Sequence, residues 1–255
     1  MSRLLVVTDL DGTLLDHDNY SFAAAGEALA MLRQRQIPLV LCSSKTRPEM
    51  LALQGALDIN APFICENGAA IYTPGEDEPE ALVPPRASVL DVLHRLRAEE
   101  GFSFTGFADM STAEIAECTG LTSAAAALAA SRDFSEPLRW EDSESRLEAF
   151  HARLAEHDLR AQQGGRFLTV AGPTDKGQAL ERLRRRFAGD ATVIALGDSP
   201  NDLAMLAAAD IAVIIKSARS DTLNPQGPAR VVRSQQPGPA GWQEAMLPLL
   251  EEFKE

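Results

Sequence analysis

The sequence has few cysteines, no excess of basic residues and no long apolar run, and each of these absences excludes a class of protein. Among 255 residues there are only three cysteines, Cys42, Cys65 and Cys118, an odd number without C-x-x-C spacing, so neither a disulfide framework nor a zinc site is indicated. Basic residues are not in excess, because 24 Lys and Arg stand against 37 Asp and Glu. Nucleic acid is therefore not an expected partner, since binding a phosphate backbone needs a basic face. No apolar run approaches the ~20 residues of a membrane-spanning helix, so no membrane partner is expected either.

The amino-terminal residues also lack the pattern of a signal peptide. The segment Met-Ser-Arg-Leu-Leu-Val-Val-Thr-Asp reaches an acidic residue before a hydrophobic region of sufficient length develops. We therefore expect a cytoplasmic protein. Hydrophobic residues make up 45% of the chain and charged residues 24%, a composition typical of a globular protein that buries a full core.

Strand and helix patterns alternate at both ends of the chain. Residues 4–8 and 37–42 are short apolar runs typical of parallel strands buried on both faces, and a helical pattern over 21–36 lies between them. The same alternation predicts a helix over 46–57, a strand over 62–65, a helix over 176–188, a strand over 192–196, a helix over 201–209, a strand over 211–215 and a helix over 239–254. This repetition predicts an α/β fold with a Rossmann-like parallel sheet.

A different pattern separates these two parts. Residues 73–80, Thr-Pro-Gly-Glu-Asp-Glu-Pro-Glu, form an acidic, turn-rich stretch. The segments that follow predict helices near 86–100, 112–119, 123–132 and 143–158, and short strands near 102–107, 134–140, 159–163 and 166–171. We therefore predict two domains: a core of residues 1–73 and 174–255, and an inserted α+β domain of residues 74–173.

Two acidic pairs follow predicted buried strands. Asp9 and Asp11 come directly after the first strand, where residues two apart in extended chain point to the same side, and Gly12 permits a sharp turn. Asp198 and Asp202 follow another strand, so both pairs are expected at the carboxyl edge of the sheet, where open α/β sheets bind ligands. Either pair alone is equally typical of a turn or a helix N-cap. Together they predict a site for a hard divalent cation, and Mg²⁺ is the usual choice beside phosphate.

Two further segments complete a predicted phosphate site. Cys42-Ser-Ser-Lys-Thr ends the second strand and begins a helix, where hydroxyl groups, backbone amides and the helix N-terminus can hold an anion. Lys176 begins another helix, a position that the helix dipole makes unfavourable for a cation. A bound phosphate would explain this lysine, and the alternative is an exposed lysine without a role.

These motifs resemble those of the haloacid dehalogenase superfamily of phosphotransferases. The resemblance rests on Asp9-Leu-Asp-Gly-Thr, on Ser43 after an apolar strand, on Lys176 and on Gly197-Asp-Ser-Pro-Asn-Asp, in family order. The inserted domain resembles the C2-type cap of this superfamily, and Glu66-Asn-Gly-Ala fits its Cof-like branch. Within that branch the chain is most similar to the mannosyl-3-phosphoglycerate phosphatases. That similarity rests on Ser43-Ser-Lys-Thr-Arg, Trp140-Glu-Asp-Ser, Gly164-Gly-Arg-Phe and Pro239-Ala-Gly-Trp-Gln-Glu.

The resemblance implies a role for each site residue. Asp9 is the expected nucleophile, which forms an aspartyl-phosphate, and Asp11 the expected general acid and base. The expected Mg²⁺ ligands are the Asp9 carboxylate, the Asp11 backbone carbonyl and Asp198, and Asp202 is expected to orient either the metal shell or the phosphate-binding lysine. The remaining residues expected to bind phosphate or substrate are Ser43, Ser44, Lys45, Asn67, Arg166, Lys176 and Asn201.

Substrate choice is expected to lie with the cap, because the core contacts mainly the phosphoryl group. Arg166 is the candidate there, since a glycerate carboxylate needs a bidentate donor, and a surface arginine in a hairpin is the alternative. The expected reaction is Mg²⁺-dependent hydrolysis of mannosyl-3-phosphoglycerate to mannosylglycerate and phosphate, a step of osmolyte biosynthesis.

The sequence is also compatible with other functions. The substrate of a phosphatase could instead be glucosyl-3-phosphoglycerate or sucrose phosphate, and a phosphomannomutase shares the same cap class. Outside the enzymes, a phospho-receiver signalling domain also combines an aspartate, a lysine and magnesium, but it does not need Asp11. For the phosphatase we expect a monomer or weak homodimer with a small phosphorylated sugar as substrate. The part played by residues 216–230, which have the pattern of a loop, is left open.

Overall fold

A computed structural model describes residues 4–164 and 166–253, and the chain divides into two compact units. The first unit contains the described residues of 1–44, 59–79 and 175–255, and the second contains those of 45–58 and 80–174. Residues 45–58 thus belong to the second unit, whereas the division inferred from the sequence assigns them to the core. The roles of the two units as catalytic core and cap remain a prediction.

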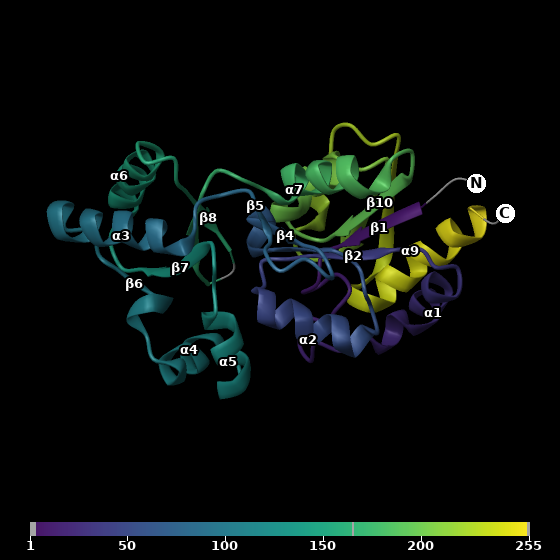
Figure 1. Ribbon diagram of the computed structural model, residues 1–255, viewed down its shortest axis with the longest axis horizontal. Coiled ribbons are helices and arrows are strands. Elements are labelled where there is room, and N and C mark those ends of the chain that lie inside the picture. The colour runs from purple at the N-terminus through teal and green to yellow at the C-terminus, as the bar shows by residue number, and fades with distance from the viewer. Residues whose placement is uncertain (1–3, 165, 254–255) are drawn as a thin grey trace. The chain divides into compact units, whose positions relative to one another are not determined.

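A twisted parallel sheet forms the centre of the first unit (Figure 1). The strands that this unit contributes to it are β1 (Leu4–Thr8), β2 (Leu39–Cys42), β3 (Phe63–Cys65), β4 (Ala70–Tyr72), β10 (Thr192–Gly197), β11 (Ile211–Lys216) and β12 (Arg230–Pro237), in the order β12-β11-β10-β1-β2-β3-β4. All neighbouring pairs are parallel except β3 with β4. Strands from opposite ends of the chain therefore lie side by side at the centre, and the predicted α/β fold with a parallel sheet is confirmed.

Helices cover this sheet and bury its central strands. They are α1 (Gly26–Gln34), α7 (Lys176–Leu183), α8 (Leu203–Ala207) and α9 (Gly238–Glu252). Every residue of β1 is buried, which explains its continuous apolar sequence. Helix α9 packs against β11, β12 and α1, and α7 packs against α8. Gly177 makes the second contact possible, because a Cβ there would lie 2.5 Å from the Ala204 carbonyl oxygen.

The segment predicted to be a loop over 216–230 leads into a strand that the sequence pattern did not indicate. Within it, residues Ser220–Thr222 form one turn of 3-10 helix, and β12 begins at Arg230. Most residues of β12 are exposed, and Ser234 is its one buried residue. A strand at the end of a sheet order tolerates charged and polar residues, so β12 has neither an apolar run nor a clear alternation.

The second unit is an antiparallel sheet with helices, as the α+β pattern predicts. Its strands are β5 (Glu80–Ala81), β6 (Phe104–Gly106), β7 (Ser135–Trp140), β8 (Arg160–Gln163) and β9 (Leu168–Ala171), of which the last four pair in the order β6-β7-β9-β8. Its helices are α2 (Arg47–Leu57), α3 (Arg86–Glu100), α4 (Thr112–Thr119), α5 (Ser123–Ala130) and α6 (Glu144–Ala155). The core of this sheet and its helices includes Phe104, Leu138, Phe150 and Val170.

Two polar contacts hold this unit together. The buried carboxylate of Glu136 accepts a hydrogen bond from Arg86 Nε at 2.6 Å and another from the Ala108 amide at 2.7 Å, so its charge is fully compensated. The Thr46 hydroxyl, at the N-cap of α2, donates to the Leu128 carbonyl oxygen of α5 at 2.8 Å. It belongs to the packing of α2 against α5, which agrees with the grouping of residues 45–58 with the second unit. No helix among the described residues is long and apolar enough to cross a membrane.

Candidate active site

The ends of five adjacent parallel strands bring polar residues to one edge of the first unit's sheet. Asp9 follows β1, Asp198 follows β10, Ser43 follows β2, Ser217 follows β11, and Asn67 lies in the turn after β3. The side chains of Asp9 and Ser43 are buried, and that of Asp198 is nearly so. The order of the strands therefore brings the two acidic pairs to one edge of the sheet, as the sequence predicts.

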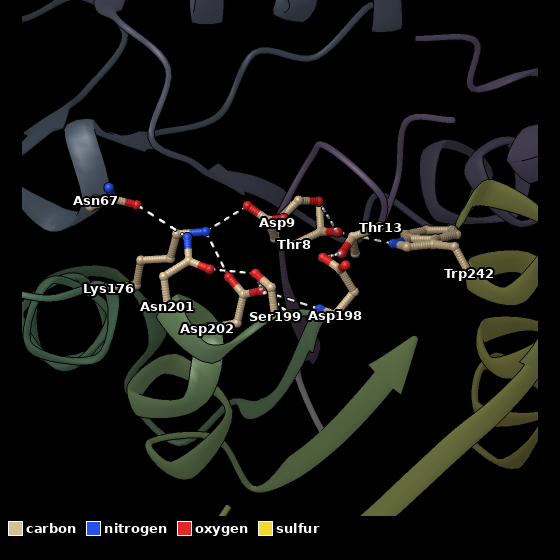
Figure 2. A network of polar contacts seen from close by, with 10 residues as sticks. All are labelled: Thr8, Asp9, Thr13, Asn67, Lys176, Asp198, Ser199, Asn201, Asp202 and Trp242. Carbon is tan, nitrogen blue, oxygen red and sulfur yellow. Dashed lines mark hydrogen bonds and ion pairs between the residues drawn. The ribbon is translucent and has the colours of Figure 1, made fainter. Parts of the chain in front are cut away.

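Lys176 lies between two of these carboxylates (Figure 2). Its Nζ is 2.5 Å from Asp9 Oδ1 and 2.6 Å from Asp202 Oδ1, and its side chain is completely buried. Burial lowers the pKa of Lys176, but the carboxylates of Asp202 and Asp9 outweigh burial and raise this pKa above its usual range. The lysine is therefore a cation at neutral pH, and the alternative of an exposed lysine does not hold.

Asp202 fixes both this lysine and the turn that carries Asp198. Its second oxygen, Oδ2, accepts hydrogen bonds from the backbone amides of Asp198 and Ser199, each at 3.1 Å. Gly197 makes room for this arrangement, because a Cβ there would lie 2.5 Å from Asp202 Cβ. Both oxygens of Asp202 are thus occupied by protein donors.

Two hydroxyl groups hold Asp198, and the backbone at Gly12 lies close to its carboxylate. The Thr13 hydroxyl donates to Asp198 Oδ1 at 3.1 Å, and the Ser217 hydroxyl donates to the Asp198 backbone carbonyl at 2.7 Å. Gly12 has a positive φ of 81°, and a Cβ there would lie 3.0 Å from Asp198 Oδ2. Thr13 and Ser217 were not among the site residues predicted from the sequence. Ser217 could have been found, because it follows a predicted buried strand just as Asp9 does.

The turn after β3 joins the site through a strained backbone. Asn67 and the preceding Glu66 both have positive φ, 59° and 48°, a conformation that persists only where the surroundings enforce it. The Asn67 amide donates to the Ser43 carbonyl at 2.9 Å, and its side-chain Oδ1 accepts from Asn201 Nδ2 at 3.3 Å. The next residue, Gly68, lies so close to the start of α7 that a Cβ would come within 2.2 Å of the Asp175 carbonyl oxygen.

The remaining predicted site residues lie in different places. Asp11 is partly buried, and Ser44 is exposed at the end of the first unit's first segment. Lys45 and Arg166 belong to the second unit. There the exposed Arg166 donates from Nη1 to the Cys118 carbonyl at 3.0 Å. Their predicted roles in substrate binding remain predictions.

Comparison with known families settles the relationship of the chain. The family of haloacid dehalogenase-like hydrolases matches residues 6–107 and 133–224, which is more than half of the chain. The chain belongs to this family. The superfamily resemblance of its motifs is therefore confirmed, whereas the finer similarity to mannosyl-3-phosphoglycerate phosphatases remains a prediction.

Solved structures with low sequence identity share the fold of this haloacid dehalogenase-like hydrolase. A protein of Thermoplasma acidophilum is 16% identical with a TM-score of 0.72, over 98% of this chain and 99% of that one. A phosphatase of the same superfamily from Bacteroides thetaiotaomicron is 17% identical with a TM-score of 0.70, over 98% and 96%. The sucrose-phosphatase of Synechocystis, solved with sucrose and phosphate, is 17% identical with a TM-score of 0.66, over 98% and 99%.

The acidic cluster has the composition of a site for a hard cation. One carboxylate oxygen each from Asp9, Asp198 and Asp202 lie within 4.8 Å of one another. Burial, followed by the charge of Asp202, raises the pKa of Asp9 to about 8 and that of Asp198 to about 6. Since Asp202 is already bound by Lys176 and two amides, Asp9 and Asp198 are the carboxylates left to hold a cation. All-oxygen ligands of this kind fit the magnesium that the family resemblance implies.

Cation binding to this cluster is expected to strengthen with pH. In the metal-free protein the raised pKa values keep Asp9 and Asp198 partly protonated below pH 8 and pH 6, respectively, and Mg²⁺ must displace these protons. The native state also holds protons that the unfolded chain releases near pH 4, so these groups make the metal-free fold less stable as the pH rises from 4 to 8.

Calorimetric titration with Mg²⁺ between pH 5.5 and pH 8, in two buffers of different ionisation enthalpy, measures both the affinity and the protons released. We expect tighter binding at pH 8 and proton release at pH 6.5. Asp198→Asn serves as the control and should weaken binding at every pH. An affinity that does not change with pH, or binding without proton release, would contradict the expectation.

Proposed function

We propose that this chain is a phosphatase that hydrolyses a phosphorylated sugar through an aspartyl-phosphate on Asp9. The observation that carries the proposal is the carboxylate of Asp9 at the end of β1, paired at 2.5 Å with the buried cation of Lys176. A carboxylate nucleophile beside a fixed positive charge suits attack on phosphorus, because that charge also attracts the phosphoryl oxygens. Membership of the hydrolase family supports the same chemistry.

The proposed reaction has two steps. One oxygen of Asp9 attacks phosphorus, the bond from phosphorus to the ester oxygen of the substrate breaks, and Asp11 gives its proton to that oxygen. Asp11 then takes a proton from a water molecule, the water oxygen attacks phosphorus, and the bond to Asp9 breaks. Asp9 is regenerated as a carboxylate and Asp11 as an acid, and the products are the dephosphorylated substrate, which now has a hydroxyl group, and inorganic phosphate.

The other residues of the site hold the reacting groups. Asp9, Asp198 and the Asp11 backbone carbonyl would hold Mg²⁺, which when bound neutralises charge between the nucleophile and the phosphoryl group. Lys176, the Ser43 hydroxyl and the Ser44 amide would bind phosphoryl oxygens. The Asn201 side chain, which is hydrogen-bonded to Asn67, is proposed to assist in this binding.

The proposed substrate is mannosyl-3-phosphoglycerate. The support for it is the sequence similarity around Ser43, Trp140, Arg166 and Trp242. Sucrose phosphate is an alternative substrate, because the chain is similar in fold to the sucrose-phosphatase of Synechocystis. Glucosyl-3-phosphoglycerate is a second alternative. The division of labour between a phosphate-binding core and a specificity-determining cap remains part of the proposal.

A comparison of substrates tests this assignment. Phosphate release is measured with Mg²⁺ and with EDTA, for mannosyl-3-phosphoglycerate, glucosyl-3-phosphoglycerate, sucrose phosphate and mannose 1-phosphate. We expect metal-dependent release with the highest kcat/KM for the mannosyl compound. Equal, weak activity on all four compounds would contradict the assignment of mannosyl-3-phosphoglycerate as the substrate. Isomerised sugar phosphate without free phosphate would favour a mutase, and a long-lived aspartyl-phosphate without turnover would favour a signalling receiver.

Arg166 is expected to recognise the glycerate carboxylate of this substrate. Arg166→Gln should lower kcat/KM for mannosyl-3-phosphoglycerate by roughly 10- to 100-fold, because a charge-assisted bidentate contact is lost. Mannose 1-phosphate has no carboxylate, so its kcat/KM should not change. Arg160→Gln, in the strand β8 of the same unit, is the matched control. Equal losses for both substrates would show that Arg166 does not read the carboxylate.

A further inference from the structure

A buried tryptophan on the last helix is connected to the backbone of Asp9 (Figure 2). The indole Nε1–H of Trp242, in α9, donates to Thr8 Oγ1 at 3.0 Å. The Thr8 hydroxyl in turn donates to the backbone carbonyl of Asp9 at 2.7 Å. Trp242 and Thr8 are both completely buried. We propose that Trp242 and Thr8 are positioning residues that fix the backbone of the nucleophile, an inference that rests on the proposed function of Asp9.

The backbone at Asp9 needs such a contact because it leaves the sheet there. The last residues paired between β1 and β10 are Thr8 and Leu196. The Asp9 amide still donates to the Leu196 carbonyl at 2.9 Å, but the Asp9 carbonyl lies beyond the paired residues. The Thr8 hydroxyl donates a hydrogen bond to this carbonyl. Both the backbone amide and the backbone carbonyl of Asp9 are therefore held by hydrogen bonds.

The direction of the two hydrogen bonds is set by Trp242. An indole N–H can only donate, whereas a hydroxyl both donates and accepts. When the Thr8 oxygen accepts from the indole, its own proton is free to point to the Asp9 carbonyl. Trp242 therefore selects the orientation of the Thr8 hydroxyl that holds the Asp9 backbone.

Helix α9 is itself anchored tightly enough to act as a support. Gly241 packs directly on β12, because a Cβ there would lie 1.9 Å from the Gln236 carbonyl oxygen. On the other side of Trp242, Gln243 Oε1 accepts a hydrogen bond from the Glu27 amide at the start of α1, at 2.9 Å. The residues on either side of Trp242 thus fix α9 to the sheet and to α1.

Kinetics of matched variants test the positioning role. Thr8→Val removes the hydroxyl at nearly constant volume and should lower kcat by roughly ten- to a hundredfold with little change in KM. Thr8→Ser keeps the hydroxyl and should retain most of kcat. Trp242→Phe should lower kcat several-fold, but it should have no further effect in the Thr8→Val background, because the indole then has nothing to bind.

A control separates positioning from loss of stability. Met246 is buried one turn further along α9 and has no N–H or O–H in its side chain, so Met246→Ala loosens the helix without touching the hydrogen bonds. It should lower the melting temperature but leave kcat near the wild-type value. If Met246→Ala lowers kcat as much as Thr8→Val does, or if Thr8→Val retains wild-type kcat, the inference is overturned.

A second measurement does not depend on turnover. The chain has two tryptophans, Trp140 and Trp242, and the indole N–H signals of both can be followed by ¹⁵N NMR during Mg²⁺ titration. In the wild type, Mg²⁺ binding at Asp9 should shift the Trp242 signal and leave the Trp140 signal unchanged. In Thr8→Val, Mg²⁺ should no longer shift the Trp242 signal. Mg²⁺ binding detected by calorimetry with an unmoved Trp242 signal would overturn the inference while leaving the proposed function intact. Absence of both Mg²⁺ binding and phosphate release from the wild type would overturn the two together.

Discussion

Asp9→Asn is expected to abolish phosphate release, with kcat falling by roughly 10⁴-fold or more. An amide cannot replace the carboxylate that attacks phosphorus, so no aspartyl-phosphate can form. Phosphate release at saturating Mg²⁺, measured on the substrate with the highest wild-type kcat/KM, gives the result directly. Release within tenfold of the wild type would show that Asp9 is not the nucleophile.

The same variant is expected to remain folded, which makes its inactivity interpretable. The pKa of Asp9 is raised to about 8, chiefly by burial, so the ionised carboxylate is costly in the metal-free fold. A neutral amide avoids this cost, and Lys176 keeps Asp202 as its partner. The melting temperature of metal-free Asp9→Asn should therefore equal or exceed that of the wild type at pH 8. A variant that fails to fold would instead show that Asp9 is needed for the structure.

Lys176→Met is expected to have the largest effect on stability, about 3–5 kcal/mol at pH 8. The substitution keeps the length of the side chain but leaves Asp9 and Asp202 buried together without the cation that compensates both. Protonation of Asp9, whose pKa is raised to about 8, can relieve part of the repulsion, so the loss should be smaller at pH 5. Urea denaturation of the metal-free protein at the two pH values measures the change in the free energy of unfolding.

Two controls make this prediction specific. Lys216→Met removes an exposed lysine at the end of β11 and should change the free energy of unfolding by less than about 0.5 kcal/mol. Asp202→Asn in the Lys176→Met background removes one of the two repelling charges and should restore part of the lost stability. A loss below about 1 kcal/mol for Lys176→Met would mean that the buried ion pairs contribute little to the fold.

The sequence predicted those parts of the site that depend on strand ends. Asp9, Ser43 and Asp198 each follow a continuous apolar run, and a parallel sheet brings such positions to a common edge whatever the sequence between them. The buried position of Lys176 could be suspected for a related reason, since a cation at a helix N-terminus needs an anion nearby. The fold class is predictable on the same grounds, because strands buried on both faces have a distinctive composition.

Other parts depend on contacts that no local pattern records. The hydrogen bond between Trp242 and Thr8 joins residues 234 positions apart and depends on how α9 packs on the sheet. The grouping of residues 45–58 with the second unit depends on the packing of α2 against α5, which includes the hydrogen bond of Thr46. Strand β12 was not predicted for a different reason. Most of its residues are exposed, so it lacks the apolar run that is typical of the central strands.

The most direct test of the central claim is to trap the aspartyl-phosphate. The wild type with Mg²⁺ and excess substrate is quenched in acid during turnover, and the protein is treated with borohydride, which reduces an acyl phosphate to the alcohol. Peptide mass spectrometry should then find homoserine at position 9, and no such product in Asp9→Asn or without substrate. Rapid phosphate release with an unmodified Asp9, or with the acyl phosphate on another residue, would contradict the account.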